Sequence, residues 1–418
     1  MKIVRNAITL CGAGALVAVA ACSSSNGSSS SSAAAGDNAA GSSAASSAAN
    51  SSGGLSILDV AAESGPLAEV GKDQEYGVKA AVAAINAAGG VNGKPVTVTY
   101  VDDASTGTQA VSVLSQALSS GSRPDVVLPG STSTEGVPLA PILMKAKIFT
   151  VTHSATTTLS NASEFPYLFG TIFPAAQMES TLADGLIAKG FKKVAIVSAD
   201  DELGQSGSSA LKAALQAKGI ATTVELVPDT SVDATPQLEA LKAANPDVLA
   251  IDNFGPSAAA VLKARAELGW NIPAYGSENL AADNLSQIAT PAELKGLTLL
   301  CLTYGVIGNP AQQTTAFKTF YQGVTALNGG RFTFGINDEI VGWDDVIVAA
   351  AAADKAHSTS ASALQAAAES LTSADTPLWV GPNPIGYTAT NHYPVYGSSV
   401  WVYVPAGPTL DGSIKPGS

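Results

Sequence analysis

The sequence predicts an α/β protein with two similar lobes, each built on a parallel sheet flanked by helices. From Leu55 onward, short runs rich in β-branched residues alternate with longer segments whose apolar residues recur at helical spacing. The same alternation restarts after Phe173, which favours two lobes over one very large sheet. At 418 residues, the chain is long enough for two such lobes.

The first set of predicted elements ends near Thr152. Its predicted strands are LSILDVAA (55–62), PVTVTYVDD (95–103), DVVLP (125–129) and KIFTVT (147–152). Its predicted helices are residues 71–88, with Val78, Val82 and Ile85 on one face before Gly89 and Gly90, a segment marked by Val111, Leu114 and Leu118, and GVPLAPILMKAK (136–147).

The second set repeats this order after Phe173. Its predicted strands are KKVAIVSAD (192–200), ATTVELV (221–227) and DVLAIDN (247–253). Its predicted helices surround Leu182 and Leu186, Leu211 and Leu215, Leu238 and Leu241, and the run AAAVLKARAELG (258–269).

The N-terminus is typical of an exported chain. Lys2 and Arg5 precede an apolar run that is too short to span a bilayer, so residues 1–21 are predicted to be a signal peptide. The run ends in Val-Ala-Ala-Cys22, which resembles the lipobox of bacterial lipoproteins and implies lipidation of Cys22; the alternative is an ordinary secretory signal with an incidental cysteine. Residues 22–54 are rich in Ser, Ala and Gly and are predicted to be a flexible tether.

Composition excludes several classes of function. The formal net charge is −13, and 21 Lys and Arg residues are scattered along the chain, which argues against a nucleic-acid partner. No cluster of Cys, His and carboxylates has metal-ligand spacing, so neither a metal nor another cofactor is expected. Cys301 is predicted to be a buried apolar residue without a disulfide partner.

The turn LPGSTSTEG (128–136) joins a predicted strand to a predicted helix. Its hydroxyls and the unpaired N–H groups of the helix start favour an anion, and open α/β sheets bind ligands at this edge. A phosphate-binding P-loop is rejected because Val137 stands where its lysine is required. The turn also lacks the Gly-x-Ser-x-Gly motif that a serine hydrolase requires. His153, the one candidate base, is better explained as a hydrogen-bonded loop histidine.

Two pairs of adjacent acids follow strands and can be mistaken for catalytic carboxylates. Asp102 and Asp103 form one pair, and Asp200 and Asp201 form the other. Adjacent residues on a strand point to opposite faces, so neither pair converges on one substrate atom. Helix N-caps and solvated loop acids are the favoured interpretation.

Several segments together resemble a known family. INAAGGVNGKPV followed by two aspartates, then GSTSTEGVPLAP, PYLFGTIFP, KKVAIVSADDELGQSG and PAYGSENLA occur in an order similar to that of the leucine/isoleucine/valine-type substrate-binding proteins of ABC importers, which have the type I periplasmic-binding fold. The resemblance covers nearly everything from Leu55 to about Ala406. It implies two lobes, residues 55–172 plus 303–382 and residues 173–302 plus 383–418. They would be joined by three crossovers near 169–174, 299–305 and 380–387 and would close on a small ligand.

The resemblance also assigns a ligand site. Ser133 and Thr156 match the hydroxyls that hold a ligand carboxylate, while the backbone carbonyl of Ser154 and the carboxylate of Glu278 match the groups that hold its ammonium. These roles agree with the chemistry of a helix start and of a buried acid. The alternatives are an N-cap for Ser133, a turn hydroxyl for Thr156 and a surface acid for Glu278.

Three positions depart from the family pattern. Val70 and Leu203 replace aromatic residues, and Phe254 keeps a ring without a hydroxyl, so the predicted pocket is more apolar than that of a leucine binder. Leu203 and Phe254 are still predicted to line it. Trp343 is predicted to pack in a core helix, although a place at the cleft opening is the alternative.

The resulting functional hypothesis is a monomeric, lipid-anchored, extracytoplasmic subunit of an ABC importer. It would bind an amino acid or a related small carboxylate without catalysis and would deliver it to a membrane permease served by ATPase subunits. A sensor of the same fold that signals to a membrane receptor is the alternative, and a surface hydrolase using His153 is a remote one.

Overall fold

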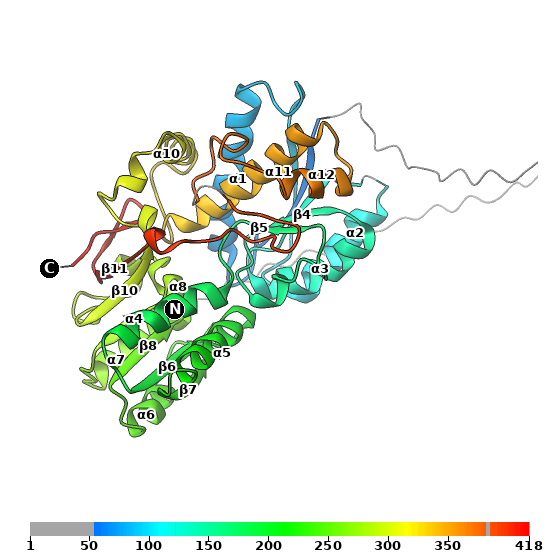
Figure 1. Ribbon diagram of the computed structural model, residues 1–418. Helices are drawn as coiled ribbons and strands as arrows, with labels where there is room; N and C mark the ends of the chain where they lie inside the picture. Colours follow the sequence, from blue (N-terminus) through cyan, green and yellow to red (C-terminus); the bar gives the residue numbers. More distant parts are fainter. Residues whose placement is uncertain (1–53, 122, 382–384, 418) are drawn as a thin grey trace, which may run out of the picture. The chain divides into compact units, whose positions relative to one another are not determined.

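Two parallel sheets organise the computed structural model, which describes residues 54–121, 123–381 and 385–417 (Figure 1). The predicted signal peptide, Cys22 and the predicted tether up to residue 53 lie outside the described residues. We call the first sheet and the helices packed on it the first lobe, and the second sheet with its helices the second lobe. This is the predicted α/β arrangement.

The first sheet has five parallel strands in the order β2-β1-β3-β4-β5. The strands are β1 (Ser56–Ala61), β2 (Thr97–Asp102), β3 (Val126–Pro129), β4 (Phe149–Thr152) and β5 (Leu168–Gly170). The helices of this lobe are α1 (Ala68–Ala87), α2 (Gly107–Ser119), α3 (Ser133–Ala146), α10 (Thr315–Asn328), α11 (Asn337–Ala356) and α12 (Ala361–Ala368), with the short 3-10 helix η1 (Thr157–Leu159) after β4.

The second sheet has six strands in the order β11-β10-β9-β8-β6-β7, and only β11 runs antiparallel to its neighbour. The strands are β6 (Lys193–Ala199), β7 (Ala221–Val227), β8 (Val248–Asp252), β9 (Ala274–Gly276), β10 (Leu297–Leu302) and β11 (Trp401–Pro405). The helices are α4 (Ala175–Ala188), α5 (Glu202–Gln216), α6 (Thr235–Ala243), α7 (Gly255–Glu267), α8 (Glu278–Ala281) and α9 (Leu285–Ile288). Three further 3-10 helices, η2 (Thr303–Gly305), η3 (Pro310–Gln313) and η4 (Ser398–Val400), and the hairpin β12 (Thr409–Leu410) and β13 (Ser413–Ile414) complete the chain.

Both faces of the first sheet are buried, because alternate residues of a strand point to opposite sides. Ile57 belongs to the core shared with α1, α10 and α11, whereas Leu58 and Val60 belong to the core under α2 and α3. Cys301 is buried in β10, as predicted.

The chain passes between the two sheets three times. The passages lie between β5 and α4, between β10 and α10, and between α12 and β11. Residues 382–384 of the third predicted crossover lie outside the described residues. After them, the backbone carbonyl of His392 accepts from Gly170 N at 2.8 Å, so this part of the third passage packs on the edge of the first sheet.

Helices α1 and α11 approach each other closely at two glycines. A Cβ atom on Gly77 would lie 1.9 Å from Glu339 O, and one on Gly342 would lie 2.1 Å from Gln74 O. Next to this contact, Trp343 is fully buried and donates from Nε1 to Leu378 O at 2.8 Å. The prediction that Trp343 packs in a core helix is therefore confirmed.

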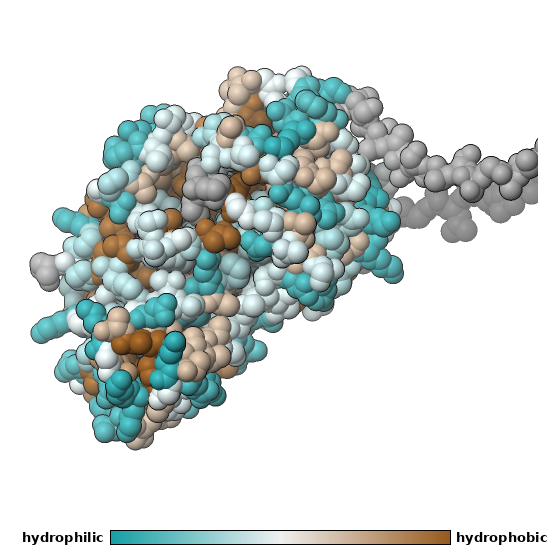
Figure 2. All heavy atoms as spheres, in the orientation of Figure 1, coloured by the Kyte–Doolittle hydropathy of each residue, from teal (hydrophilic) through white to brown (hydrophobic). Residues whose placement is uncertain are grey.

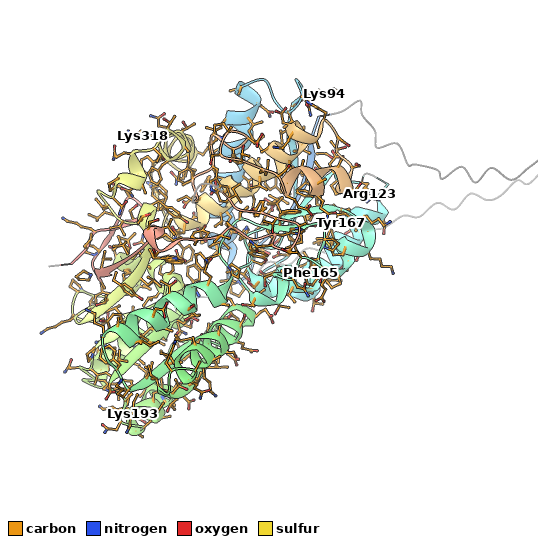
Figure 3. All side chains as sticks on the ribbon, viewed as in Figure 1. Lys94, Arg123, Phe165, Tyr167, Lys193 and Lys318 are labelled. Atoms are coloured by element: carbon orange, nitrogen blue, oxygen red, sulfur yellow. The ribbon has the colours of Figure 1, made fainter. Side chains whose placement is uncertain are left out.

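Hydrophilic side chains cover most of the face in Figure 2, and hydrophobic ones form small separate patches. Figure 3 shows Lys94, Arg123, Lys193 and Lys318 on different elements, so these cations do not form one basic surface. Within the described ranges, the helices lack the combination of length and apolar composition needed to cross a membrane.

We expect Gly77→Ala to destabilise the protein strongly. The added methyl group overlaps backbone atoms of α11, which cannot rotate away, and overpacking of this kind costs about 3 kcal/mol. Urea unfolding followed by circular dichroism measures the loss. Gly397→Ala is the control, because a Cβ atom there meets nothing within 4 Å; equal stability of the two variants would contradict the close helix contact.

Candidate functional site

The N-terminus of α3 is fixed by a capping box. Thr132 is the N-cap: its Oγ1 accepts from Thr134 N at 3.3 Å, and the Glu135 carboxylate accepts from Thr132 N at 2.9 Å. Gly130 precedes the cap with φ +82°, where a Cβ atom would overlap the Glu135 side chain. Because Thr132 caps the helix, Ser133 is left as its first residue, with a buried hydroxyl for another partner.

The loop after β4 lies directly against this helix start. Thr156 N donates to Ser133 Oγ at 3.3 Å, so the structure brings two of the predicted ligand residues together. Gly136 permits this approach, since a Cβ atom there would lie 2.3 Å from Ser154 Oγ. The buried Ser154 Oγ has no hydrogen-bond partner among the described residues, and Ser154 O accepts from Tyr393 Oη at 3.1 Å. Sequence reasoning missed Tyr393.

Glu278 begins α8, directly after β9 and Ser277, and is only 2% exposed. The alternative of a surface acid is therefore wrong. Burial raises the pKa of Glu278 well above its usual value, and the negative charges of Asp338 and Asp252 raise it further. Its one close partner in the described structure is Asn337, which donates from Nδ2 to Glu278 Oε1 from the start of α11.

The second lobe contains a pair of buried carboxyl groups, Glu179 and Asp252. Asp252, at the end of β8, accepts from Ser277 Oγ at 2.6 Å and from Asn279 Nδ2 at 2.8 Å. The pKa of Glu179 is raised well above its usual value, first by burial and then by Asp252. Burial also raises the pKa of Asp252, but hydrogen bonds from Ser277, Asn279 and Ser198 oppose that rise. This pair fixes the residues on both sides of Glu278.

Leu203 and Phe254, the remaining predicted pocket residues, lie in the second lobe. Leu203 lies half-buried in the first turn of α5. Phe254 precedes α7, and its ring stacks on Phe334 with centroids 5.1 Å apart. Val70, which replaces an aromatic residue of the family pattern, is buried in α1 of the first lobe.

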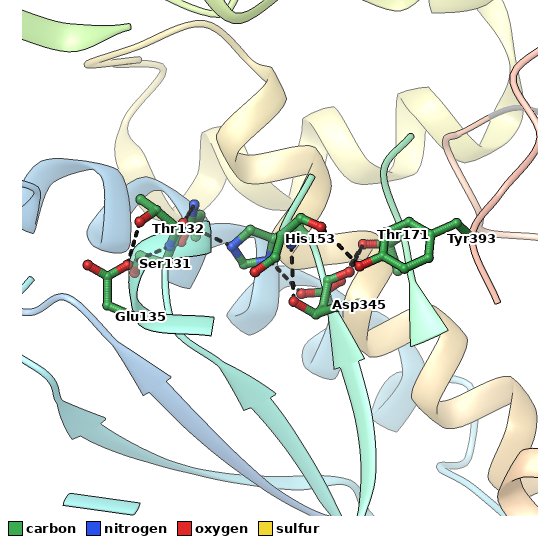
Figure 4. Close-up of polar contacts among 10 residues, drawn as sticks. Ser131, Thr132, Glu135, His153, Thr171, Asp345 and Tyr393 are labelled. Atoms are coloured by element: carbon green, nitrogen blue, oxygen red, sulfur yellow. Dashed lines mark hydrogen bonds and ion pairs between the residues drawn. The ribbon is translucent and has the colours of Figure 1, made fainter. Parts of the chain in front are cut away.

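His153 is held from both sides of its ring. Nδ1 lies 2.7 Å from Asp345 Oδ2 and Nε2 lies 3.1 Å from Ser131 O, so both nitrogens face acceptors and the imidazole carries two protons (Figure 4). Asp345 also accepts from the Thr171 hydroxyl. Burial is the largest influence and lowers the pKa of His153, but the charge and hydrogen bond of Asp345, together with Ser131 O and the charge of Asp59, outweigh it and the net pKa is raised.

This arrangement gives His153 no free nitrogen with which to deprotonate Ser154. The prediction of a hydrogen-bonded loop histidine is confirmed. Asp201 is the N-cap of α5, accepting from Gly204 N at 2.6 Å, as expected for a helix cap. For Asp103 the interpretation as a cap or solvated loop acid is wrong, because Asp103 is fully buried and Thr106 caps the next helix, α2. Among the described residues, no group of three or more His, Cys, Asp or Glu side chains is placed to hold a metal ion.

A hollow of about 310 Å³ opens between α3 and the start of α5. Its lining residues are Thr134, Val137, Pro138, Asp200, Asp201, Glu202, Gln205 and Asp229. At its edge, Glu202 Oε1 accepts from Thr156 Oγ1 at 3.3 Å and from Thr158 Oγ1 at 2.9 Å. Sequence reasoning missed Glu202, although it stands one position before Leu203 and three positions after the end of β6.

Fold and site together define a two-lobed binding protein of the type I periplasmic-binding class. Residues 59–403 match the Periplasmic binding protein family, and the chain belongs to this family. A Leu/Ile/Val-binding protein homolog from Brucella melitensis is 27% identical over 53% of this chain. The chain spans about 60% to 66% of the length of the first curated relatives it matches.

Solved structures confirm the predicted fold class. An extracellular ligand-binding receptor from Rhodopseudomonas palustris HaA2 superposes with a TM-score of 0.74 at 21% identity, covering 87% of this chain and 99% of the receptor. A solute binding protein of R. palustris in complex with benzoate gives 0.70 at 19% identity, covering 87% and 95%.

We expect Asp345→Asn to lower the pKa of His153 below its usual value. The variant removes the Asp345 charge, the largest of the influences that oppose burial, so burial dominates and the imidazole titrates at lower pH. NMR titration of the histidine ring protons measures this shift. His392, whose pKa is lowered mainly by burial, is an internal control and should not move. An unchanged His153 titration would show that Asp345 does not hold the imidazolium.

Proposed function

We propose that the chain is the extracytoplasmic solute-binding subunit of an ABC importer and that it captures a small carboxylate, with amino acids favoured. The observation that carries this proposal is that two hydroxyl residues lie against each other at a helix start in the first lobe, while a buried acid in the second lobe has no cationic partner among the described residues. Ser133 and Thr156 supply the hydroxyls, and Glu278 is the acid.

The carboxylate end of the ligand fits the start of α3. The first turn of a helix has N–H groups without intrahelical partners and a partial positive charge, both of which favour an anion. Ser133 Oγ and Thr156 Oγ1 add hydroxyl donors at the same place. His153 adds a positive charge in the same loop, three residues before Thr156.

The ammonium end fits Glu278. Burial raises the pKa of Glu278 and so disfavours its charged form, and a ligand ammonium supplies the opposite charge that favours it. The Ser154 carbonyl already accepts from Tyr393, yet a carbonyl oxygen has two lone pairs and can accept from a ligand as well. Leu203 and Phe254 line the apolar part of the site in this proposal.

The named relatives support this ligand class without selecting one member. The Brucella melitensis relative is named for Leu, Ile and Val, and a structural neighbour holds benzoate. Both kinds of ligand carry a carboxylate beside an apolar body. Amino acids are favoured because Glu278 is otherwise an acid buried without a cation.

In the proposed mechanism, the two lobes close over the ligand. We infer lobe boundaries at residues 55–172 plus 303–382 and residues 173–302 plus 383–418, with the three passages acting as the hinge. The closed, monomeric protein then docks on a permease that ATPase subunits drive. No bond is made or broken, which agrees with the double protonation of His153.

Thermal unfolding of residues 55–418, the chain without its predicted signal peptide and tether, tests the proposal. The panel consists of leucine, valine, phenylalanine, their deaminated acids and benzoate. A ligand present at a hundred times its Kd adds about 2.7 kcal/mol of stability, and we expect leucine or a similar amino acid to raise the Tm by several degrees.

Glu278→Gln should abolish the shift with amino acids and keep any shift with the deaminated acids, because only the ammonium loses its partner. Glu225→Gln, which neutralises an acid on β7, is the matched control and should behave as wild type. If amino acids still raise the Tm of Glu278→Gln, Glu278 does not bind the ligand ammonium. If no compound of the panel raises the Tm of the wild type, the proposed ligand class is wrong.

We also propose that the chain is a lipoprotein anchored through Cys22. Cys22→Ser in the full-length chain should move the protein from the membrane fraction to the soluble fraction of a bacterial host. Metabolic labelling with a fatty-acid probe gives a second readout, and Cys11→Ser is the control that should keep the label. Equal membrane retention and labelling of both variants would contradict lipidation at Cys22.

A further inference from the structure

Glu202 is the first residue of α5 and reaches from the second lobe to the first. Because Asp201 caps the helix, the Glu202 side chain does not have to accept from the backbone N–H groups of the first turn. The carboxylate also lies at the positive end of a 15-residue helix, where a negative charge is stabilised.

The partners of Glu202 are hydroxyls of the first lobe. Its Oε1 atom accepts from Thr158 Oγ1 at 2.9 Å and from Thr156 Oγ1 at 3.3 Å. One turn further along α5, Ser206 Oγ accepts from Thr157 N at 3.2 Å. Two side chains of α5 therefore hold three consecutive residues of the loop after β4.

We propose that Glu202 is a built-in carboxylate that occupies the place of a ligand carboxylate at Thr156 and clasps the two lobes together. A hydroxyl has one proton to donate, so Thr156 Oγ1 cannot serve Glu202 and a ligand carboxylate at once. The ligand part of this proposal rests on the carboxylate site proposed above, whereas the clasp between the lobes does not.

The charges around the hollow explain why the exchange discriminates between ligands. Asp200, Asp201 and Asp229 line it from the second lobe, and the buried Glu135 faces them from α3. Burial and then the charge of Asp229 raise the pKa of Asp201 to about 7, against the hydrogen bond from Gly204 N, and the charges of Asp252 and Glu135 make smaller contributions. No lysine or arginine is among the lining residues of this hollow.

A ligand carboxylate must therefore displace Glu202 into a region that is already negative. An uncharged ligand of the same shape does not meet this repulsion. Glu202 thus acts as a selectivity residue that weakens the binding of acids relative to their amides, and its removal strengthens the binding of acids.

Hydrogen–deuterium exchange on the full-length protein tests the clasp without a ligand. Glu202→Gln should speed exchange in the peptide that contains Thr156 to Thr158 by about tenfold, because a hydrogen bond to a charged group is replaced by a weaker neutral one. Asp229→Asn removes a charge from the same hollow and should leave this exchange rate unchanged. Equal rates in wild type and Glu202→Gln, or equal acceleration in both variants, would overturn the clasp.

Calorimetric titration with matched acids and amides tests the ligand part. The pairs are leucine with leucinamide and benzoate with benzamide. Glu202→Gln should bind the acid of a pair several-fold more tightly than wild type does and should bind the amide equally. Acid binding that is unchanged or weaker in Glu202→Gln overturns the competition. If neither acid binds wild type or variant, the proposed ligand class fails, and the exchange rates still decide the clasp.

Discussion

The close packing of α11 on α1 is the constraint on which the candidate site depends. The two helices meet backbone to backbone at Gly77 and Gly342, which fixes the position of α11 over the first sheet. From that position α11 supplies Asp345 to His153 and, at its first residue, Asn337 to Glu278. One helix therefore positions groups at both ends of the proposed ligand site, and a shift of α11 would disturb both ends together.

The second constraint is the excess of buried acids over cations. Asp59 has a pKa raised to about 7 by burial, and Asp338 has one raised to about 8 mainly for the same reason; His153 lowers the pKa of both. The charge of His153 therefore stabilises the ionised forms of Asp59 and Asp338 as well as that of Asp345. Elsewhere the structure uses neutral donors, as at Asp252, where Ser198, Ser277 and Asn279 share the carboxylate. An interior of this kind accepts a cation more readily than another anion.

The sequence predicted what depends on local patterns. Strands and helices from β1 to α7 follow the expected alternation, and Glu278 follows β9 as its position after Gly276 and Ser277 implied. The helix α11 could not be assigned in this way, because nearly all of its residues as far as Ala353 are buried and leave no amphipathic stripe. The missed site residues Glu202, Asn337 and Tyr393 act on partners 46, 59 and 239 positions away, so no local pattern marks them.

Under the proposed function, two carboxyls of the second lobe affect opposite ends of the ligand. Burial raises the pKa of Glu278 and disfavours its charged form, which a ligand ammonium stabilises and a ligand without an amine does not. Glu202 competes for the Thr156 hydroxyl with any carboxylate, whether or not the ligand carries an amine. An amino acid therefore has a favourable interaction with Glu278 that opposes the competition with Glu202. A benzoate-like acid has the competition alone. This asymmetry is the physical reason to favour amino acids over aromatic acids within one fold that accommodates both.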